Sequence, residues 1–155
     1  MAYRILEHTA DVRLLVEGRT LEELFQEALG GMMEVLKPEK KEGGAERLRR
    51  IEVEAASRTA LLVDFLNEAL WLAHCHKEML VLARIEVTQG DAVPDEKDAQ
   101  AGMPAPLRTE TRVEATLRGW PAEAFGEDIK AVTYHEAEIR ENAAGNLETV
   151  LVFDI

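Results

Sequence analysis

The chain has 155 residues, 46% of them hydrophobic, which is enough for one domain with a sizeable core. Its 30 acidic and 18 basic residues leave a formal net charge of −12, so a phosphate backbone would be repelled over most of the surface. This balance argues against stable, direct nucleic-acid binding and favours a cation or a basic protein as the partner.

Two further features bear on where the protein works. The single cysteine, Cys75, excludes an internal disulfide and suits a reducing compartment. We expect neither a membrane span nor a signal peptide, because the sequence has no apolar run of about 18 residues and no extended apolar stretch near its start. The sequence therefore predicts a cytoplasmic protein.

The first part of the chain predicts two short strands followed by a helix. Residues 3–6 and 12–17 have the apolar content and alternation of strands. Apolar residues then recur at helical spacing over residues 21–36, and a proline and a Gly-Gly pair end this helix. Thr20 is a good N-cap, and Glu23, three residues later, completes a capping box.

The middle of the chain predicts a half-buried strand and a second helix. Residues 48–55 alternate between apolar and charged side chains. Ser57 can cap the helix that follows, in which apolar residues form a stripe from Leu62 to Ala73. The opposite face carries Asp64, Asn67 and Glu68. Asp64 and Glu68 lie one turn apart, where two carboxylates can in principle bind a cation, but a solvated acidic face is the commoner case.

The last part of the chain is rich in strands. The strand-like segments are residues 80–88, 107–119, 129–139 and 147–155, and a hairpin turn over residues 142–146 joins the last two. Residues 89–106, with three prolines and two glycines, predict a mobile surface loop. The whole order predicts a single α+β domain over residues 1–155: a mixed, largely antiparallel sheet of about six or seven strands with two main helices packed on one face.

Familiar catalytic and nucleotide-binding motifs are absent from the sequence. It has no phosphate-binding loop ending in Gly-Lys-Ser/Thr, no Gly-x-Gly-x-x-Gly and no Gly-x-Ser-x-Gly. His74 and His76 lie two residues apart, but successive helical residues point about 100° apart, so one zinc ion cannot readily take both. With no nucleophile–base pair to name, a stand-alone metal-dependent hydrolase is the weakest functional hypothesis.

Acidic residues in apolar, strand-like sequence near both ends form the best candidate site. Asp11 directly precedes the second strand, and Asp154 is followed at once by the main-chain carboxylate of Ile155. If the first and last strands are neighbours, these groups supply the hard oxygen ligands that Ca²⁺ or Mg²⁺ prefers. The alternative is that Asp11 caps a turn and Asp154 faces solvent. Chemistry alone favours this alternative, because the meeting of the two ends is assumed.

The segment Ile129–His135 is a second candidate. On a strand, Lys130, Val132, Tyr134 and Glu136 share one face, where a lysine, a tyrosine and a glutamate can form a polar site or contact a phosphate. The alternative is an exposed strand face in a sheet with one wet side, which is the commoner case.

Four segments, taken together and in order, resemble the archease family. They are Tyr-Arg-Ile-Leu-Glu-His-Thr-Ala-Asp-Val (3–12), Leu-Leu-Val-Asp-Phe-Leu-Asn-Glu (61–68), Ile-Lys-Ala-Val-Thr-Tyr-His (129–135) and Phe-Asp-Ile (153–155). The resemblance runs from end to end of the chain. Arg13 and Glu136 depart from the small residue and the glycine that are common at these positions.

The resemblance implies a non-catalytic activator of the RtcB-type tRNA-splicing RNA ligase, which joins ends carrying a 3′-phosphate or 2′,3′-cyclic phosphate to a 5′-hydroxyl. Such an activator promotes guanylylation and multiple turnover of the ligase. The resemblance also implies a divalent-metal site made by Asp11, Asp154 and Ile155, with Ca²⁺ the expected ion and Mg²⁺ or Mn²⁺ as alternatives. Lys130 and His135 are expected to be functional residues by the same likeness.

The rival hypothesis comes from a different class. It is a chaperone or modulator of RNA-modifying enzymes, such as a tRNA methyltransferase, in which the acidic cluster is only structural. A client enzyme would then be protected from aggregation equally well by an Asp154→Ala variant.

Overall fold

The computed structural model describes residues 2–6, 11–94, 107–134 and 137–155, and for residues 91–94 and 107–109 it describes the backbone alone. Over these ranges the elements are β1 (Ala2–Leu6), β2 (Asp11–Gly18), α1 (Leu21–Leu36), β3 (Pro38–Lys40), β4 (Arg47–Ala55), α2 (Arg58–His76), β5 (Glu78–Pro94), β6 (Leu107–Phe125), β7 (Ala131–Thr133), β8 (Arg140–Glu141) and β9 (Leu147–Asp154).

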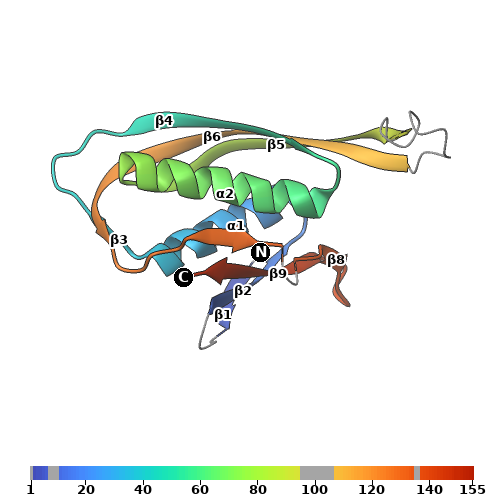
Figure 1. The fold of residues 1–155 in the computed structure, drawn as a ribbon, viewed down its shortest axis with the longest axis horizontal. Helices are drawn as coiled ribbons and strands as arrows, with labels where there is room; N and C mark the ends of the chain where they lie inside the picture. The colour runs from blue at the N-terminus through green and yellow to red at the C-terminus, as the bar shows by residue number, and fades with distance from the viewer. Residues whose placement is uncertain (1, 7–10, 95–106, 135–136) are drawn as a thin grey trace.

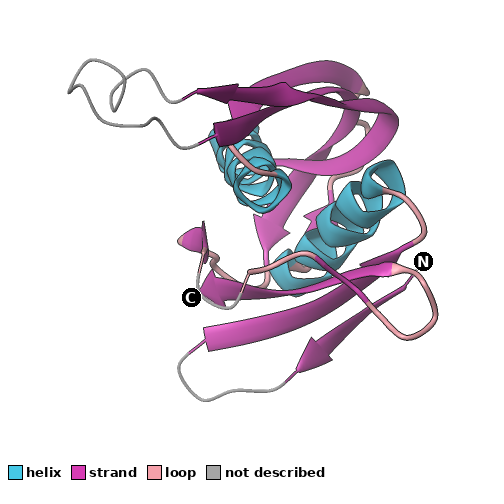
Figure 2. Cartoon of the chain, turned by 90° about the vertical axis from the view of Figure 1, so that its right-hand side faces the viewer, coloured by secondary structure: helices cyan, strands magenta, loops and turns pink. Residues whose placement is uncertain are grey.

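The strands form two antiparallel sheets, and both helices lie between them (Figures 1 and 2). One sheet has the order β1-β2-β9-β7, with β8 also paired to β9; the other has β6 paired to β3, β4 and β5. The α+β class and the antiparallel pairing are confirmed. The expected single sheet with helices on one face is corrected to two sheets. The reason is that α1 carries buried apolar residues on more than one side, and each of the two sheets packs against one of these sides.

Each helix begins where its capping residue predicts. The Thr20 hydroxyl accepts a hydrogen bond from the Glu23 amide at 3.1 Å, and the Ser57 hydroxyl accepts from the Ala60 amide at 3.1 Å. The Glu23 carboxylate in turn accepts from the amide of Arg19, one residue before the position that a capping box uses, at 3.2 Å. Helix α1 therefore starts and ends where its spacing indicates.

The core is shared by both sheets and both helices. Helix α1 contacts β2 on one side and β5 on the other, while α2 contacts β4, β6 and β7. The rings of Phe25 and Phe65 join the two helices, with centroids 5.4 Å apart. Gly31 lets α1 approach β2 closely, because a Cβ there would lie 2.6 Å from a methyl carbon of Leu14.

The second sheet extends further than its alternation predicts. Residues 89–94, expected in a loop, continue β5, and residues 38–40, expected as a helix stop, form the short strand β3 against β6. The rest of the expected loop, residues 95–106, lies outside the described residues. Ladder hydrogen bonds to β6 explain the longer strand, since its pairing partner supplies bonds that composition does not reveal.

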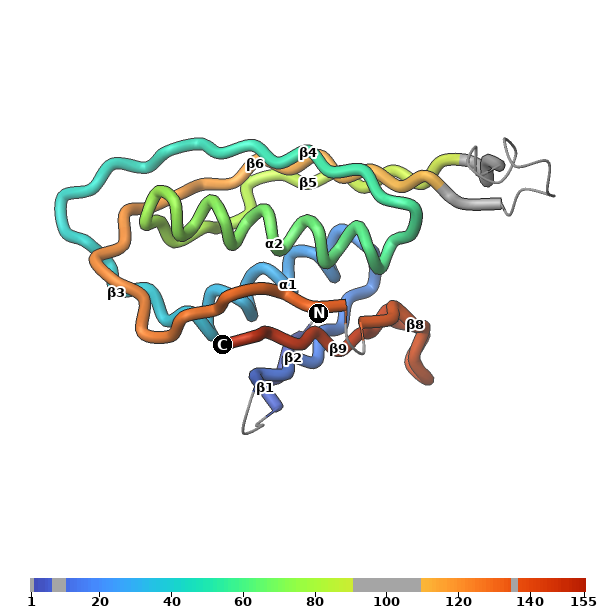
Figure 3. Tube along the Cα trace, in the orientation of Figure 1, coloured from blue at the N-terminus to red at the C-terminus, as the bar shows by residue number. Residues whose placement is uncertain are grey.

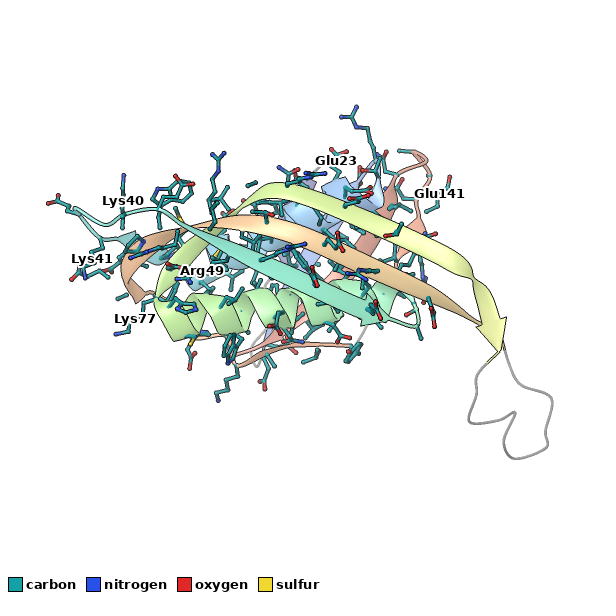
Figure 4. The ribbon with its side chains drawn as sticks, turned by 90° about the horizontal axis from the view of Figure 1, so that it is seen from above. Glu23, Lys40, Lys41, Arg49, Lys77 and Glu141 are labelled. Atoms are coloured by element: carbon teal, nitrogen blue, oxygen red, sulfur yellow. The ribbon has the colours of Figure 1, made fainter. Side chains whose placement is uncertain are left out.

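A buried ion pair marks one end of this sheet. The Arg49 guanidinium donates two hydrogen bonds, at 2.8 and 3.0 Å, to the carboxylate of Glu78, which is 3% exposed. Figure 4 shows Arg49 on β4. Gly119 leaves room for this carboxylate, because a Cβ there would lie 2.4 Å from Glu78 Oε1.

No helix in the described parts of the chain is long and apolar enough to cross a membrane.

Candidate metal site at the strand ends

The structure brings the two acidic ends together. Strand β2 pairs antiparallel with β9 in a register that sets Asp11 directly opposite Asp154. Side chains of directly opposed residues leave the same face of a sheet, a few ångströms apart at Cβ. The expectation that the early and late strands are neighbours is therefore confirmed in its geometry. Asp154 is exposed, while Asp11 and Ile155 are half-buried.

Strand β7 carries Lys130 to the same place. It pairs with the other edge of β9, with Ala131 opposite Asp154, and the Lys130 amide donates a 2.7 Å hydrogen bond to the Asp154 carbonyl. Residues that are distant in sequence thus meet at the end of one sheet. Three of the sequence-predicted functional residues, Asp11, Asp154 and Lys130, lie together there. His135 lies outside the described residues.

A side chain of helix α2 fixes the outer edge of β7. The Val132 amide donates to Asn67 Oδ1 at 2.8 Å, and Asn67 Nδ2 donates to the Val132 carbonyl at 2.9 Å. The carboxamide thereby takes the place of a neighbouring strand and satisfies both polar groups of this residue. Asn67 lies on the polar face of α2, and at this point of the helix that face meets the edge of β7.

The same helix holds the rest of the segment on both sides of β7. His74 Nε2 lies 3.2 Å from the Ile129 carbonyl, and the Ile139 amide donates to the Thr59 hydroxyl at 3.1 Å. The Arg58 guanidinium donates to the Ile139 carbonyl at 3.1 Å. The expected strand over residues 129–139 is corrected to the three residues of β7, because side chains of α2 take up backbone groups on either side of it.

Tyr134 and Asp64 form a further link between α2 and this segment. The Tyr134 hydroxyl donates to the Asp64 carboxylate. This hydrogen bond, with desolvation and the nearby negative charge, raises the pKa of Tyr134 to about 12. Val132 is buried, while the Tyr134 side chain reaches α2 through its hydroxyl and is still more than half exposed. The sequence signal for both contacts is that Asp64 and Asn67 lie on the polar face of α2, three residues apart.

The donor groups at this end fit a hard cation by their chemistry. Asp11 and Asp154 each offer a carboxylate, and the Ile155 main-chain carboxylate follows directly. These are the oxygen ligands of Ca²⁺, Mg²⁺ and Mn²⁺, and no thiolate or imidazole stands among them. Within the described ranges no group of three His, Cys, Asp or Glu side chains gathers as a metal cluster. Asp11 and Asp154 are two of the several oxygen ligands that such an ion takes.

The fold is that of a small α+β protein with two antiparallel sheets and two helices, in which Asp11 and Asp154 lie opposite each other at the ends of two central strands. Residues 3–155 match the model of the Archease protein family (MTH1598/TM1083). The chain thus belongs to the archease family.

Individual relatives agree along the whole chain. The archease of Methanosarcina mazei is 30% identical over 154 residues, which cover 99% of this chain and 95% of the relative. The archease of Pyrococcus abyssi is 30% identical over 166 residues, with 96% and 95% covered.

Two solved structures are similar in fold. The solution structure of Methanobacterium thermoautotrophicum protein 1598 has a TM-score of 0.69 and 25% identity, and 99% of this chain and 98% of that one are covered. The crystal structure of a Thermotoga maritima archease, described as a possible chaperone, has a TM-score of 0.57 and covers 97% and 94%. At 22% identity the second likeness concerns the fold alone.

Proposed function

We propose that this protein is a non-catalytic activator of an RtcB-type 3′-phosphate RNA ligase in tRNA splicing, and that it acts through a divalent cation. Membership of the archease family supports the general role. The observation that carries the proposal is the register of β2 and β9, which sets Asp11 opposite Asp154 beside the Ile155 carboxylate. The expected ion is Ca²⁺, with Mg²⁺ or Mn²⁺ as alternatives.

Each residue of the site has a separate part in this proposal. Asp11, Asp154 and the Ile155 carboxylate hold the ion, which when bound supplies positive charge for phosphate groups. Lys130 adds a second positive charge at the same end of the sheet, because its amide is fixed to the Asp154 carbonyl. In this proposal the chemical step is left to the ligase.

The charge of the protein suits this division of labour. An acidic body with a net charge of −12 is attracted to the basic surface of an enzyme that binds RNA, and it does not compete for the RNA itself. This attraction raises the rate of association more than it adds to affinity, so activation is expected to weaken as salt rises.

A stimulation assay with purified ligase tests the proposal. Wild-type protein with Ca²⁺ or Mn²⁺ is expected to increase ligase guanylylation and turnover, and Asp11→Ala and Asp154→Ala are each expected to abolish the gain. The matched control is Glu148→Gln. Glu148 lies opposite Glu17 on the same two strands, six residues before Asp154, so the change removes a carboxylate from the same ladder but outside the site. A ligase that gains nothing from the wild-type protein would overturn the proposal.

A second candidate is a chaperone for RNA-modifying enzymes. The possible-chaperone description of the Thermotoga maritima relative favours it. On this alternative, Asp154→Ala protects a tRNA methyltransferase client from aggregation as well as the wild type does. An aggregation assay run beside the ligase assay therefore separates the two functions.

A further inference from the structure

Two large aromatic side chains of this protein are exposed on one side of the molecule. Among the described residues, the exposed large hydrophobic side chains are those of Ile5, Leu48, Trp71, Val81 and Tyr134. The two aromatic ones, Trp71 and Tyr134, are 59% and 56% exposed. Exposed aromatic side chains that lie near one another are a common mark of a protein–protein interface.

Both aromatic residues lie where α2 runs along β7. Trp71 is one helical turn after Asn67, which holds Val132, and three residues before His74, which lies against Ile129. Trp71 therefore stands on the helix surface between the points that hold the two ends of the Ile129–Val132 stretch. Figures 1 and 3 show α2 lying above β7, with the C-terminus below it.

Tyr134 continues this surface at its other end. Its hydroxyl is bonded to Asp64, which precedes Trp71 by two helical turns on the same side of α2. Lys130, between the two aromatic residues, is exposed and is tied through its amide to the Asp154 carbonyl. We name the surface formed by Trp71, Tyr134 and Lys130 the aromatic seam; it borders the candidate metal site.

The charges around the seam are mainly acidic. Glu68 is exposed one turn from Asp64, the Asp128 side chain is 77% exposed beside His74, and Asp154 is exposed at the end of β9. The basic residues near them are Lys130 and Arg140, and Arg140 is paired with Glu138 at 2.6 Å. A surface of this kind is complementary to a partner that is basic and offers an apolar pocket for an aromatic ring.

We infer that the aromatic seam is the docking surface for the ligase, with Trp71 as the central anchor that brings the carboxylate site to the partner. The inference rests on the proposed function. It goes beyond it by separating two tasks: the seam sets how tightly the ligase is held, and the carboxylates set what the bound protein does. An enzyme whose active site binds RNA phosphates supplies the basic surface that this acidic surround requires.

A titration of the purified ligase with this protein separates the two tasks. Trp71→Ala is expected to raise the concentration that gives half-maximal activation by about tenfold or more, as for a central interface residue, with the maximum unchanged. Trp71→Phe is expected to restore most of the affinity, because a ring still fills the pocket. Asp154→Ala is expected to do the reverse: it lowers the maximum with little change in the half-maximal concentration.

Leu48→Ala is the matched control. Leu48 is 68% exposed on β4 in the other sheet, so its truncation removes an exposed side chain that is not one of the three seam residues. It is expected to leave both parameters unchanged. Thermal unfolding and Mn²⁺ titration of Trp71→Ala should match the wild type, because the side chain is mainly exposed.

Three results would overturn the inference. The first is a Trp71→Ala variant whose half-maximal concentration stays within about twofold of the wild type, while the wild type still activates. The second is a Leu48→Ala variant that loses affinity as much as Trp71→Ala does. The third is sedimentation data in which Trp71→Ala disrupts a dimer of this chain, because the seam would then be an interface between copies. Absence of wild-type activation, by contrast, would overturn the proposed function itself.

Discussion

Two pairs of like-charged residues lie opposite each other in the same β2–β9 ladder, and their surroundings differ. Glu17 lies opposite Glu148, and Asp11 lies opposite Asp154. The glutamate pair is bridged by Asn142, whose Nδ2 donates to Glu17 Oε2 at 3.0 Å and to Glu148 Oε2 at 3.2 Å. In the aspartate pair, Asp154 is exposed and Asp11 is half-buried.

The contrast shows what a carboxylate pair needs to be structural. Directly opposed like charges destabilise a strand pair unless other groups compensate them. A second amide strengthens the glutamate bridge, because Asn146 Nδ2 donates to Glu17 Oε1 at 2.9 Å. At the aspartate end the Lys130 amide donates to the main-chain carbonyl of Asp154, and the Asp154 side chain is exposed. The two carboxylates therefore stand opposite each other at the end of the ladder, where a cation can reach Asp154.

The largest expected stability effect comes from breaking the glutamate bridge. Asn142→Ala removes the donor to both glutamates and also the acceptor for the Ala144 and Asn146 amides in the hairpin turn. We expect a loss of about 3 kcal/mol in the free energy of unfolding, measured by urea denaturation.

A double mutant tests whether charge repulsion contributes to this loss. Adding Glu148→Gln to Asn142→Ala removes one of the opposed charges, so the pair of changes should cost less than the sum of the single ones. Strict additivity would contradict the role of Asn142 as a bridge between the two carboxylates.

The second prediction concerns the strand beside the aspartate pair. Asn67→Ala leaves the Val132 amide and carbonyl without the side chain that binds them, at an expected cost of about 2 kcal/mol. Because β7 is then held less firmly, the Lys130 amide should exchange its hydrogen faster, as read by NMR.

Thr59→Val is the matched control for this change. It removes a bond to the Ile139 amide, at the other end of the same segment. It should destabilise the protein while leaving exchange at Lys130 near the wild-type rate. Equal exchange in both variants would show that Asn67 does not position the site.

Much of the fold follows from local pattern, and the site does not. Helix α1, the capping residues and the hairpin turn are set by spacing and side-chain chemistry within a few residues, so the sequence predicts them. The division into two sheets, and the meeting of Asp11 with Asp154, depend on pairing between strands over 100 residues apart. The resemblance to a family, not periodicity, linked these two aspartates.

Asn67 shows the limit of pattern most clearly. On a helical wheel it belongs to the polar face, and that placement is right, but the polar face meets a strand edge instead of water. Composition cannot tell these two surroundings apart, because both a strand edge and water offer hydrogen-bond donors and acceptors to the side-chain amide. The partner of a polar face becomes visible only when the sheet is assembled.

The third prediction compares the two pairs directly through their stability. Without metal, Asp154→Asn relieves the repulsion from Asp11 and should stabilise the protein by about 0.5 kcal/mol at low salt. Glu148→Gln should do the opposite, because the Glu148 carboxylate already accepts a bond from Asn142. Thermal unfolding in a chelator measures both.

Addition of metal should reverse the order of stability, so that the wild type becomes more stable than Asp154→Asn. A ligand that binds only the folded state stabilises it by an amount that grows with the logarithm of its concentration relative to Kd, so Ca²⁺ or Mn²⁺ should raise the melting temperature of the wild type and not that of Asp154→Asn. A wild-type melting temperature that ignores both ions would contradict a cation site at this end.

The smallest expected effect concerns the ionisation of Tyr134, one of the residues of the aromatic seam. The chain has two tyrosines, Tyr3 and Tyr134, and hydrogen bonds to Glu34 and Asp64, respectively, raise the pKa of each above its usual value. A folded pKa of about 12 for Tyr134 means that its bond stabilises the fold fully below pH 10, and that this contribution is lost as the pH rises towards 12.

Absorbance of tyrosinate at 295 nm checks this titration. In the native protein both ionisations should lie above pH 10, and unfolding in urea should return both to about the ordinary value of 10. Asp64→Asn should lower the pKa of Tyr134 and leave that of Tyr3 unchanged, because the two tyrosines have different partners. If Asp64→Asn shifted neither ionisation, Tyr134 would not be held by α2, and the seam would lose the contact that joins its two ends.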